Sequence, residues 1–292
     1  MKKLPVILAL LLLCGCAPTP PADIAATTLP VYQFTQSITA GSGLTVSRLV
    51  TEEVSCLHDY TLTVDQMRAI EGARVVVLSG AGLEEFLDDA LDSAGAVIDS
   101  SASIPLLEGG HHHHHEGEEP PEEVHHHEHD PHIWLSPACA AMQAENICAG
   151  LSLEYPEYAA LFEENLGLLL ADLKKLEDYG SAQLSGLRRR EILTFHDGFG
   201  YLADAFGIEI VEAIEEESGA EASARELIHL IDEVRRHDIA AIFVEENGSG
   251  SAASIIAAET GVKTGCLSMA MSGDDYFSAM YENIDSLKEA LR

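Results

Sequence analysis

The feature that most constrains the fold is a long helical pattern in the middle of the sequence. In residues 156–184 apolar side chains recur at helical spacing, and Pro156 suits the first turn of a helix. A continuous helix of this length measures about 43 Å, which exceeds a typical globular helix. Such a helix is long enough to join two separate lobes.

The segments on both sides of this pattern alternate short β-branched runs with amphipathic runs. Before it, "RVVVLSG" and "AVIDSS" indicate buried strands, with the helical run "LEEFLDDALDSA" between them. After it, "EILTF", "IEIVEAI" and "IAAIFVEE" indicate strands, each followed by a helical run. This alternation predicts an α/β fold with parallel sheets and helices on both faces, arranged as two lobes.

The first residues predict export from the cytoplasm. "MKK" is a basic start, and "LPVILALLLL" is apolar but too short for an ordinary transmembrane helix. The stretch then ends in "LCGC", which resembles the bacterial lipobox and implies cleavage before Cys16 and lipidation of its thiol. A plain secretory signal, cleaved near Ala17, is the alternative.

The predicted organisation has five parts in chain order. They are a lipoprotein signal peptide (1–16), a Pro-rich tether (17–30), an N-terminal lobe (31–155), a linking helix (156–184) and a C-terminal lobe (185–292). Within the first lobe, residues 109–130 are rich in Glu and His and have too few core residues to fold alone, so this loop is expected to be disordered.

The strong negative charge excludes one class of partner. Asp and Glu number 49 against 16 Lys and Arg, which gives a formal net charge of -33. Nucleic acid phosphates would be repelled by such a surface. The charge suits a protein that handles cations, although solubility alone would also explain it.

Four cysteines remain once Cys14 leaves with the signal peptide and Cys16 serves as the anchor. They contain no CxxC pair, and are Cys56, Cys139, Cys148 and Cys266. Cys139 and Cys148 are expected on one helix about 13 Å apart, too far for a disulfide. All four are expected to be buried free thiols, and a Cys56–Cys266 bridge stays open.

Enzyme signatures are missing from the sequence. "SGAGLEEF" follows a predicted strand but has Glu85 where a dinucleotide fingerprint needs its third Gly, so it is interpreted as a glycine-rich turn. HExxH, GxSxG and P-loop motifs do not occur. The chain is therefore not expected to be an enzyme.

Three isolated histidines are the candidate metal ligands. His58 lies in "SCLHDYTLT", His132 in "DPHIWLSP" and His196 in "ILTFHDGFGYL". His196 directly follows a predicted strand, where parallel sheets gather their ligands. Singly, each would more often be a surface or core residue. Beside a His-rich loop in an exported chain, they indicate a zinc-type site, because imidazole suits Zn(II) whereas Mn(II) prefers oxygen donors.

Six segments carry a resemblance to a known family. They are "LHDYTLTVDQMRAI", "VVVLSGAGLEEFLDDAL", "DPHIWLSP", "LTFHDGFGYLADAFGI", "AIFVEENGSGSAASIIAAETGVKTGCLS" and "YENIDSLKEAL". In this order they resemble the metal-binding subunits of bacterial zinc/manganese ABC importers. The resemblance implies two Rossmann-like lobes joined by a rigid long helix, with a metal ion in the cleft between them. It also implies delivery of that ion to a membrane permease.

The resemblance also implies a ligand set. His58 and His132 are the first-lobe ligands and His196 is the third, where manganese-type members place a carboxylate. The fourth position departs from the family, because "CLSMAMSG" has Ser268 or a neighbour in place of an acidic residue. Water, Glu245 or a loop histidine remain open as the fourth ligand, and Glu245 could instead hydrogen-bond a ligand imidazole.

Carboxylates near these histidines are expected to orient the imidazoles. They are Asp59, Asp130 and Asp197. Helix capping is the alternative for Asp59 and Asp197.

The His-rich loop is expected to bind several ions weakly, because ordering a flexible chain costs entropy. Its histidines are His111, His112, His113, His114, His115, His125, His126, His127 and His129. Capture of zinc near the cleft, buffering and sensing are the functional alternatives, against a tolerated surface insertion.

Together these observations predict a monomeric, lipid-anchored, extracytoplasmic subunit that binds Zn(II) and passes it to an ABC permease. A manganese importer subunit is the alternative in the same class. Two other classes remain open, namely a metal-dependent surface adhesin and a zinc hydrolase built on three histidines and water. No motif supplies the general base that a hydrolase needs.

Overall fold

The structure is a computed structural model that describes most of the chain. The described residues are 21–52, 57, 60–109, 129–214, 223–246, 248 and 250–292. The predicted signal peptide with Cys16, and also His58 and Asp59, lie outside them.

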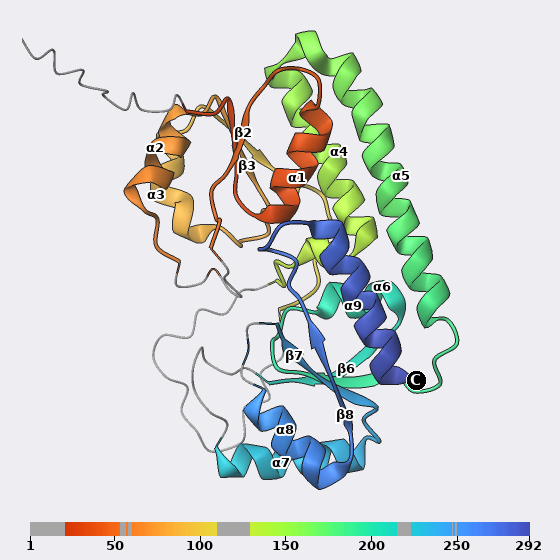
Figure 1. The fold of residues 1–292 in the computed structure, drawn as a ribbon. Helices are drawn as coiled ribbons and strands as arrows, with labels where there is room; N and C mark the ends of the chain where they lie inside the picture. Colours follow the sequence, from red (N-terminus) through yellow and green to blue (C-terminus); the bar gives the residue numbers. More distant parts are fainter. Residues whose placement is uncertain are drawn as a thin grey trace, which may run out of the picture.

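Two lobes, each built on a four-stranded parallel sheet, make up the molecule (Figure 1). The first sheet has the order β2-β1-β3-β4 and the second β6-β5-β7-β8. The strands are β1 (Ile24–Ala26), β2 (Val46–Arg48), β3 (Val75–Leu78), β4 (Ala96–Asp99), β5 (Glu191–Thr194), β6 (Glu209–Ala213), β7 (Ala241–Glu245) and β8 (Lys263–Leu267). The predicted α/β fold class, with two parallel sheets, is confirmed.

The helices cover the sheets and connect the lobes. They are α1 (Leu29–Thr39), α2 (Val64–Gly72), α3 (Asp88–Leu91), α4 (Pro137–Glu154), α5 (Ala159–Leu184), α6 (Gly200–Phe206), α7 (Ala224–Arg236), α8 (Ser251–Thr260) and α9 (Tyr276–Leu291). Short 3-10 turns η1 (Glu85–Leu87), η2 (Ile133–Leu135) and η3 (Pro156–Tyr158) precede α3, α4 and α5. None of the helices within the described ranges has the length and apolar character needed to cross a membrane.

Local sequence signals explain several helix ends. Thr63 and Gln66 form a capping box at the start of α2, and Ser223 and Glu226 form another at α7. Gly261 closes α8 with a φ of 77°, in the left-handed region that glycine tolerates best. These signals agree with the boundaries predicted from the sequence for α7 and α8.

The long helix α5 joins the lobes. It runs unbroken for 26 residues, and η3 precedes it at Pro156. In the first lobe α5 packs against α1 and α4, and in the second against α6 and α9 (Figure 1). Because one rigid element contacts both halves, their relative placement depends on its packing.

The predicted tether at 17–30 is wrong over its last residues. Strand β1 lies inside its sheet between β2 and β3, and Ile24, Ala25 and Ala26 are fully buried. Pro30, interpreted from the sequence as part of a Pro-rich tether, occupies the first turn of α1, where its missing N–H costs nothing. The first lobe therefore begins before residue 31.

Two smaller expectations also change. Asp130 was assigned to the disordered loop but is buried and forms hydrogen bonds, so the assignment is wrong for this residue. Cys139, Cys148 and Cys266 are free thiols, as expected, but Cys139 is only half-buried and Cys266 is exposed. The reason is its position on β8, the edge strand of the second sheet. Cys56 lies outside the described residues.

A single hydrophobic cluster runs through both lobes. It includes Ile24 and Phe34 of the first lobe, Leu169 of α5, and Phe243 and Ile284 of the second. Helix α9 contributes to this continuity, because it packs against β8, α5 and α1. The core is thus not interrupted at the boundary between the lobes.

The carboxyl ends of the two sheets face each other across this boundary. The N–H of Leu29, just after β1, donates a 3.1 Å hydrogen bond to the carbonyl of Met271, just after β8. In open parallel sheets, ligands bind beyond these strand ends. Any site at the boundary is therefore built from residues of both lobes.

Candidate metal centre

His132 is held rigidly at the first-lobe side of the boundary. Only 4% of it is exposed, and it immediately precedes η2. Its Nδ1 lies 2.8 Å from Oδ1 of Asp130, and its backbone N–H donates to the same oxygen at 2.9 Å. A carboxylate that accepts the Nδ1 proton leaves Nε2 as the nitrogen able to bind a metal.

His196 lies on the second-lobe side, two residues after the end of β5. Gly198 allows this position: a Cβ built on it would lie 2.8 Å from Cδ2 and 2.9 Å from Nε2 of the imidazole. Any side chain at residue 198 would therefore push the ring away. The motif "HDGFG" supplies the glycine that this position of the ring requires.

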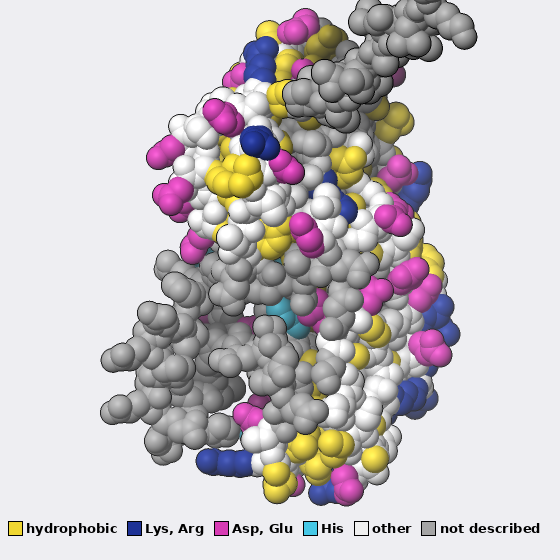
Figure 2. All heavy atoms as spheres, turned by 60° about the vertical axis from the view of Figure 1, so that its left-hand side comes forward, with side chains coloured by type: hydrophobic (Ala, Val, Ile, Leu, Met, Phe, Trp, Pro, Cys, Tyr) yellow, Lys and Arg dark blue, Asp and Glu magenta, His cyan; other side chains and the backbone are white. Residues whose placement is uncertain are grey.

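The two imidazoles approach each other across the boundary. Their ring centroids are 5.6 Å apart and their planes are inclined by 79°. Histidine nitrogens bind Zn(II) at about 2.0–2.1 Å, so two imidazoles on one tetrahedral ion have centroids about 5 Å apart. The observed spacing suits a shared ion. Figure 2 shows histidine (cyan) in the hollow between the upper and lower halves, with an acidic side chain beside it.

Glu245 completes the group of described donors. It ends β7, is 8% exposed, and places Oε2 3.8 Å from Nδ1 of His196. Burial raises the pKa of Glu245 to about 7, while the field of His132 acts in the opposite direction. Within the described ranges, no three His, Cys, Asp or Glu side chains gather closely enough to form a complete metal site.

Ser268, the other candidate for the fourth position, is engaged in local structure. Its Oγ accepts a hydrogen bond from the N–H of Ala270 at 3.2 Å. Its backbone N–H and carbonyl both pair with the side chain of Asn283, at 2.7 Å each. These bonds shape the turn after β8 and favour Glu245 over Ser268 as a donor.

His58 lies outside the described residues, but the chain on both sides of it is anchored. Leu57 is 1% exposed, and its carbonyl accepts from the N–H of Tyr60 at 3.1 Å. The Tyr60 hydroxyl donates to Glu52 at 2.7 Å and accepts from Gln66 at 2.6 Å.

Of the nine loop histidines, His129 falls within the described residues. It pairs with Glu108 in a single antiparallel bridge, which brings the two ends of the loop together. His111, His112, His113, His114, His115, His125, His126 and His127 lie outside the described residues.

Asp130 and Asp197 differ from each other in what they do. Asp130 hydrogen-bonds His132, as predicted for an orienting carboxylate, and a Cβ on Gly200 would lie 2.9 Å from its Oδ2. The second lobe thus also approaches Asp130 closely. Capping is wrong for Asp197, because α6 begins at Gly200 with Phe199 at its N-cap.

The side chain of Glu84 occupies the glycine-rich turn. Glu84 is buried and accepts from the Thr27 hydroxyl at 2.6 Å, from Ser79 N–H at 2.7 Å and from Gly80 N–H at 2.9 Å. A phosphate would need these same N–H groups. This occupancy explains physically why the turn is not a cofactor site.

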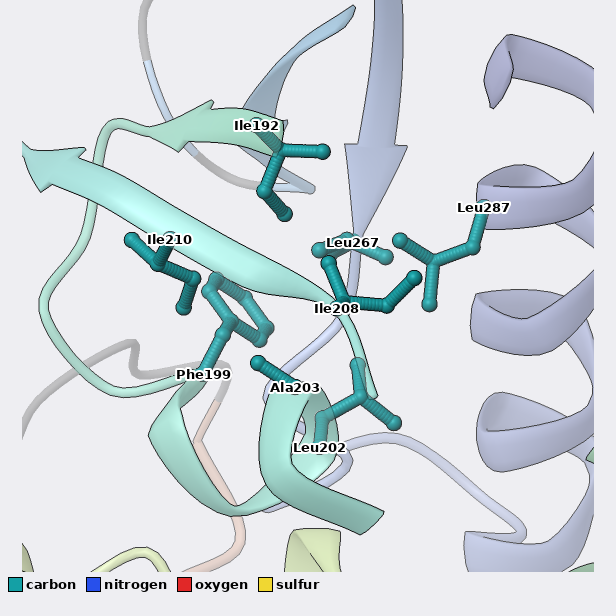
Figure 3. Close-up of a pocket in the computed structure, with 8 residues that line it drawn as sticks. All are labelled: Ile192, Phe199, Leu202, Ala203, Ile208, Ile210, Leu267 and Leu287. Atoms are coloured by element: carbon teal, nitrogen blue, oxygen red, sulfur yellow. The ribbon is translucent and has the colours of Figure 1, made fainter. Parts of the chain in front are cut away.

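An apolar pocket lies within the core of the second lobe (Figure 3). Side chains from the sheet, α6 and α9 close around it, among them Ile192, Phe199 and Leu287, and no polar atom lines it. It has no room for a water molecule. We interpret it as a small packing gap in the core, separate from the histidines.

Trp134 is the residue that sequence reasoning missed. Its indole N–H donates a 2.7 Å hydrogen bond to the carbonyl of Met269 in the other lobe. A signal existed, since it is the only tryptophan of the chain and lies two residues after His132. Its partner, however, is a backbone carbonyl 135 residues away, and no side-chain pattern identifies a backbone acceptor.

The chain is similar to zinc-binding proteins from several bacteria. It is 32% identical over 308 aligned positions to the zinc-binding lipoprotein AdcA of Streptococcus pneumoniae (strain ATCC BAA-255 / R6), covering 99% of this chain and 61% of AdcA. It is 31% identical over 280 positions to the high-affinity zinc uptake system protein ZnuA of Bacillus subtilis (strain 168), covering 92% and 87%. The chain therefore spans about three-fifths of the pneumococcal relative.

Solved structures share the two-lobed fold. The Zn(II)-bound ZnuA-like domain of Streptococcus pneumoniae AdcA superposes with a TM-score of 0.77 at 29% identity, covering 93% of this chain and 99% of the domain. A family model described as "Zinc-uptake complex component A periplasmic" matches residues 24–290, a range that includes both sheets together with His132, His196 and Glu245. The chain thus belongs to the family of periplasmic A components of zinc-uptake complexes.

Proposed function

We propose that this protein is the extracytoplasmic subunit of an ABC importer that captures Zn(II) between its lobes and delivers it to a membrane permease. The observation that carries the proposal is the approach of the His132 and His196 rings from opposite lobes to a centroid distance of 5.6 Å. The family match and the names of the zinc-binding relatives support zinc as the transported ion.

His58, His132 and His196 are proposed as the ligands, with Glu245 as the fourth. Three neutral imidazoles and one carboxylate form a tetrahedral donor set that suits Zn(II). Manganese prefers oxygen donors, so the same set disfavours it. The deep burial of His132 and Glu245 keeps water away from the ion and strengthens its interaction with the carboxylate.

The test is zinc titration of the triple variant His58→Ala, His132→Ala, His196→Ala with the His-rich loop intact. We expect the tightest site to disappear while weaker loop sites remain, as measured by competition with a chelator. In the wild type, affinity should fall toward pH 5 as the imidazoles protonate.

A matched control removes two histidines that are not among the proposed ligands. His229 pairs with Glu212 at 3.3 Å, and His237 pairs with Glu233 at 3.1 Å, both on the α7 side of the second lobe. Replacing both with Ala should leave the tight site intact. Survival of the tight site in the triple variant would refute the proposed ligand set, and a predominance of manganese after growth in mixed-metal medium would refute zinc selectivity.

Lipid anchoring through Cys16 and a monomeric state are part of the proposal. The lipobox-like "LCGC" and the lipoprotein among the relatives support the anchor. Cys16→Ala should move the protein from the membrane fraction to the soluble fraction of fractionated cells, without changing zinc affinity in the purified protein. Equal membrane retention of the variant would contradict the anchor.

A further inference from the structure

Trp134 connects the two lobes beside His132. It is fully buried on η2, and its ring packs edge-on against the His132 imidazole with centroids 5.4 Å apart. Its indole N–H donates at 2.7 Å to the carbonyl of Met269, which follows β8 in the second lobe. The residue that contacts one imidazole is thus bonded to the opposite lobe.

A second hydrogen bond fixes the same residue. The carbonyl of Trp134 accepts from the hydroxyl of Tyr276 at 2.7 Å, and Tyr276 is fully buried at the start of α9. Met269 and Tyr276 lie at the two ends of the short connection between β8 and α9. Trp134 is therefore held by both ends of one second-lobe segment.

Met269 leads back to the other imidazole. Its side chain is 3% exposed, and a Cβ built on Gly198 would lie 2.7 Å from Cε of Met269 and 2.8 Å from Cδ2 of His196. Contacts thus run from His132 through Trp134, Met269 and Gly198 to His196. A closed ring of buried contacts of this kind can set the distance between its two ends.

We propose that Trp134 is a positioning residue whose hydrogen bond to Met269 fixes the spacing of the His132 and His196 imidazoles at the value that one metal ion requires. The observed centroid distance of 5.6 Å is close to the separation of about 5 Å for two imidazoles on a tetrahedral ion. This inference rests on the proposed function, because it assumes that the two rings share an ion.

Other hydrogen bonds between the lobes involve neither imidazole. Gln33 of α1 donates to the carbonyl of Asp274 at 2.9 Å and accepts from the N–H of Tyr276 at 2.9 Å. Arg48 donates to the carbonyl of Gly273 at 2.8 Å. Gln33 bonds Tyr276, one of the residues that hold Trp134, whereas the second-lobe partner of Arg48 is Gly273, so Arg48 provides the matched control for Trp134.

The experiment compares Trp134→Phe with Arg48→Ala in the full chain. Trp134→Phe keeps an aromatic ring against His132 but loses the N–H donor. We expect zinc affinity to fall about tenfold, the scale seen when groups that orient metal ligands are lost. Bound Co(II) should show altered visible bands as its geometry relaxes. Arg48→Ala removes one hydrogen bond between the lobes but should leave the affinity and the Co(II) spectrum unchanged.

A double-mutant cycle separates positioning from general destabilisation. If Trp134 acts through the spacing of the two rings, Trp134→Phe should cost no further affinity at the weaker zinc site that remains in a His196→Ala background. An equal loss of affinity in both backgrounds would overturn the inference. Should Trp134→Phe fail to fold by circular dichroism, Tyr276→Phe removes the second bond to the same residue and should shift affinity and spectrum in the same direction.

The single histidine variants distinguish the two possible failures. If His132→Ala and His196→Ala both keep the tight zinc site, the proposed function fails and the positioning role fails with it. If both variants lose the site while Trp134→Phe binds zinc and Co(II) as the wild type does, the positioning role alone is overturned.

Discussion

The buried carboxyl of Glu84 makes the free energy of unfolding depend on pH. Burial raises its pKa from 4.5 to about 7, although hydrogen bonds from Thr27, Gly80 and Ser79 act in the opposite direction. The folded protein therefore keeps a proton on Glu84 at pH values where the unfolded chain has lost it. Between pH 4.5 and 7 the folded state binds more protons, so this group's contribution to stability falls as pH rises and levels off above pH 7.

Replacing Glu84 with Gln should remove this pH dependence. In the wild type, the contribution of Glu84 to the free energy of unfolding falls by on the order of 3 kcal/mol, since each unit of pKa shift corresponds to about 1.4 kcal/mol. Urea unfolding of metal-free protein at pH 5 and pH 7.5 measures it. The wild type should lose more unfolding free energy over this range than Glu84→Gln, because the variant does not titrate. Identical slopes for the two proteins would contradict the prediction.

The residues of the site differ in how far sequence could predict them. The motifs "DPHIWLSP" and "FHDGFGYL" pointed to His132 and His196, and adjacency pointed to Asp130. These are local signals, since each residue is recognised from its neighbours in the chain. Trp134 was missed because its role depends on the backbone carbonyl of Met269, and a backbone acceptor leaves no trace in side-chain identity.

Among the elements, α5 offers a direct test of how the lobes are joined. It contains two glycines in different surroundings. A Cβ on Gly167 would meet nothing within 4 Å, whereas a Cβ on Gly180 would lie 2.2 Å from Cε1 of Phe206 in α6. Helix propensity favours Ala at both positions, so only packing distinguishes them.

Gly167→Ala should stabilise the protein by about 0.5–1 kcal/mol through helix propensity. Gly180→Ala should destabilise it by about 1–3 kcal/mol, because Phe206 is buried and has little space to move. Guanidinium unfolding of both variants measures the difference. Stabilisation by Gly180→Ala would mean that α5 does not pack closely on α6.

The strands that sequence failed to predict are short or at an edge. Strand β1 has three residues, too few for a recognisable pattern, and its burial comes from neighbours on both sides. Strand β8 reads "KTGCL" and lacks a β-branched run because it lies at the sheet edge. The strands β3, β5 and β7 were predicted because their own residues carry the apolar runs that central positions require.

At the scale of the whole molecule, the shared core predicts one unfolding event. The cluster that includes Phe34, Leu169 and Phe243 crosses both lobes, and Trp134 and Gln33 add hydrogen bonds between them. Neither lobe can unfold without exposing apolar surface of the other. Calorimetry of the metal-free protein should show a single transition whose calorimetric and van't Hoff enthalpies agree. Two resolved transitions would show that the lobes unfold separately.

The family match also concerns the whole molecule. The match over residues 24–290 confirms the resemblance that six separate segments indicated. It also agrees with the location outside the cytoplasm that the first residues predict. The six segments are spread over both lobes, so their order along the chain indicated the two-lobed architecture. The distances between them in space come from the structure.

The bridge between Glu108 and His129 has an evolutionary consequence. Because Glu108 and His129 are neighbours in space, they close a chain loop whose length can change without moving either residue. Doubling the length of such a closed loop costs only about 0.6 kcal/mol of entropy. Natural selection can therefore lengthen, shorten or recompose the His-rich segment in response to metal supply, while the pair at its base keeps the domain beneath it intact.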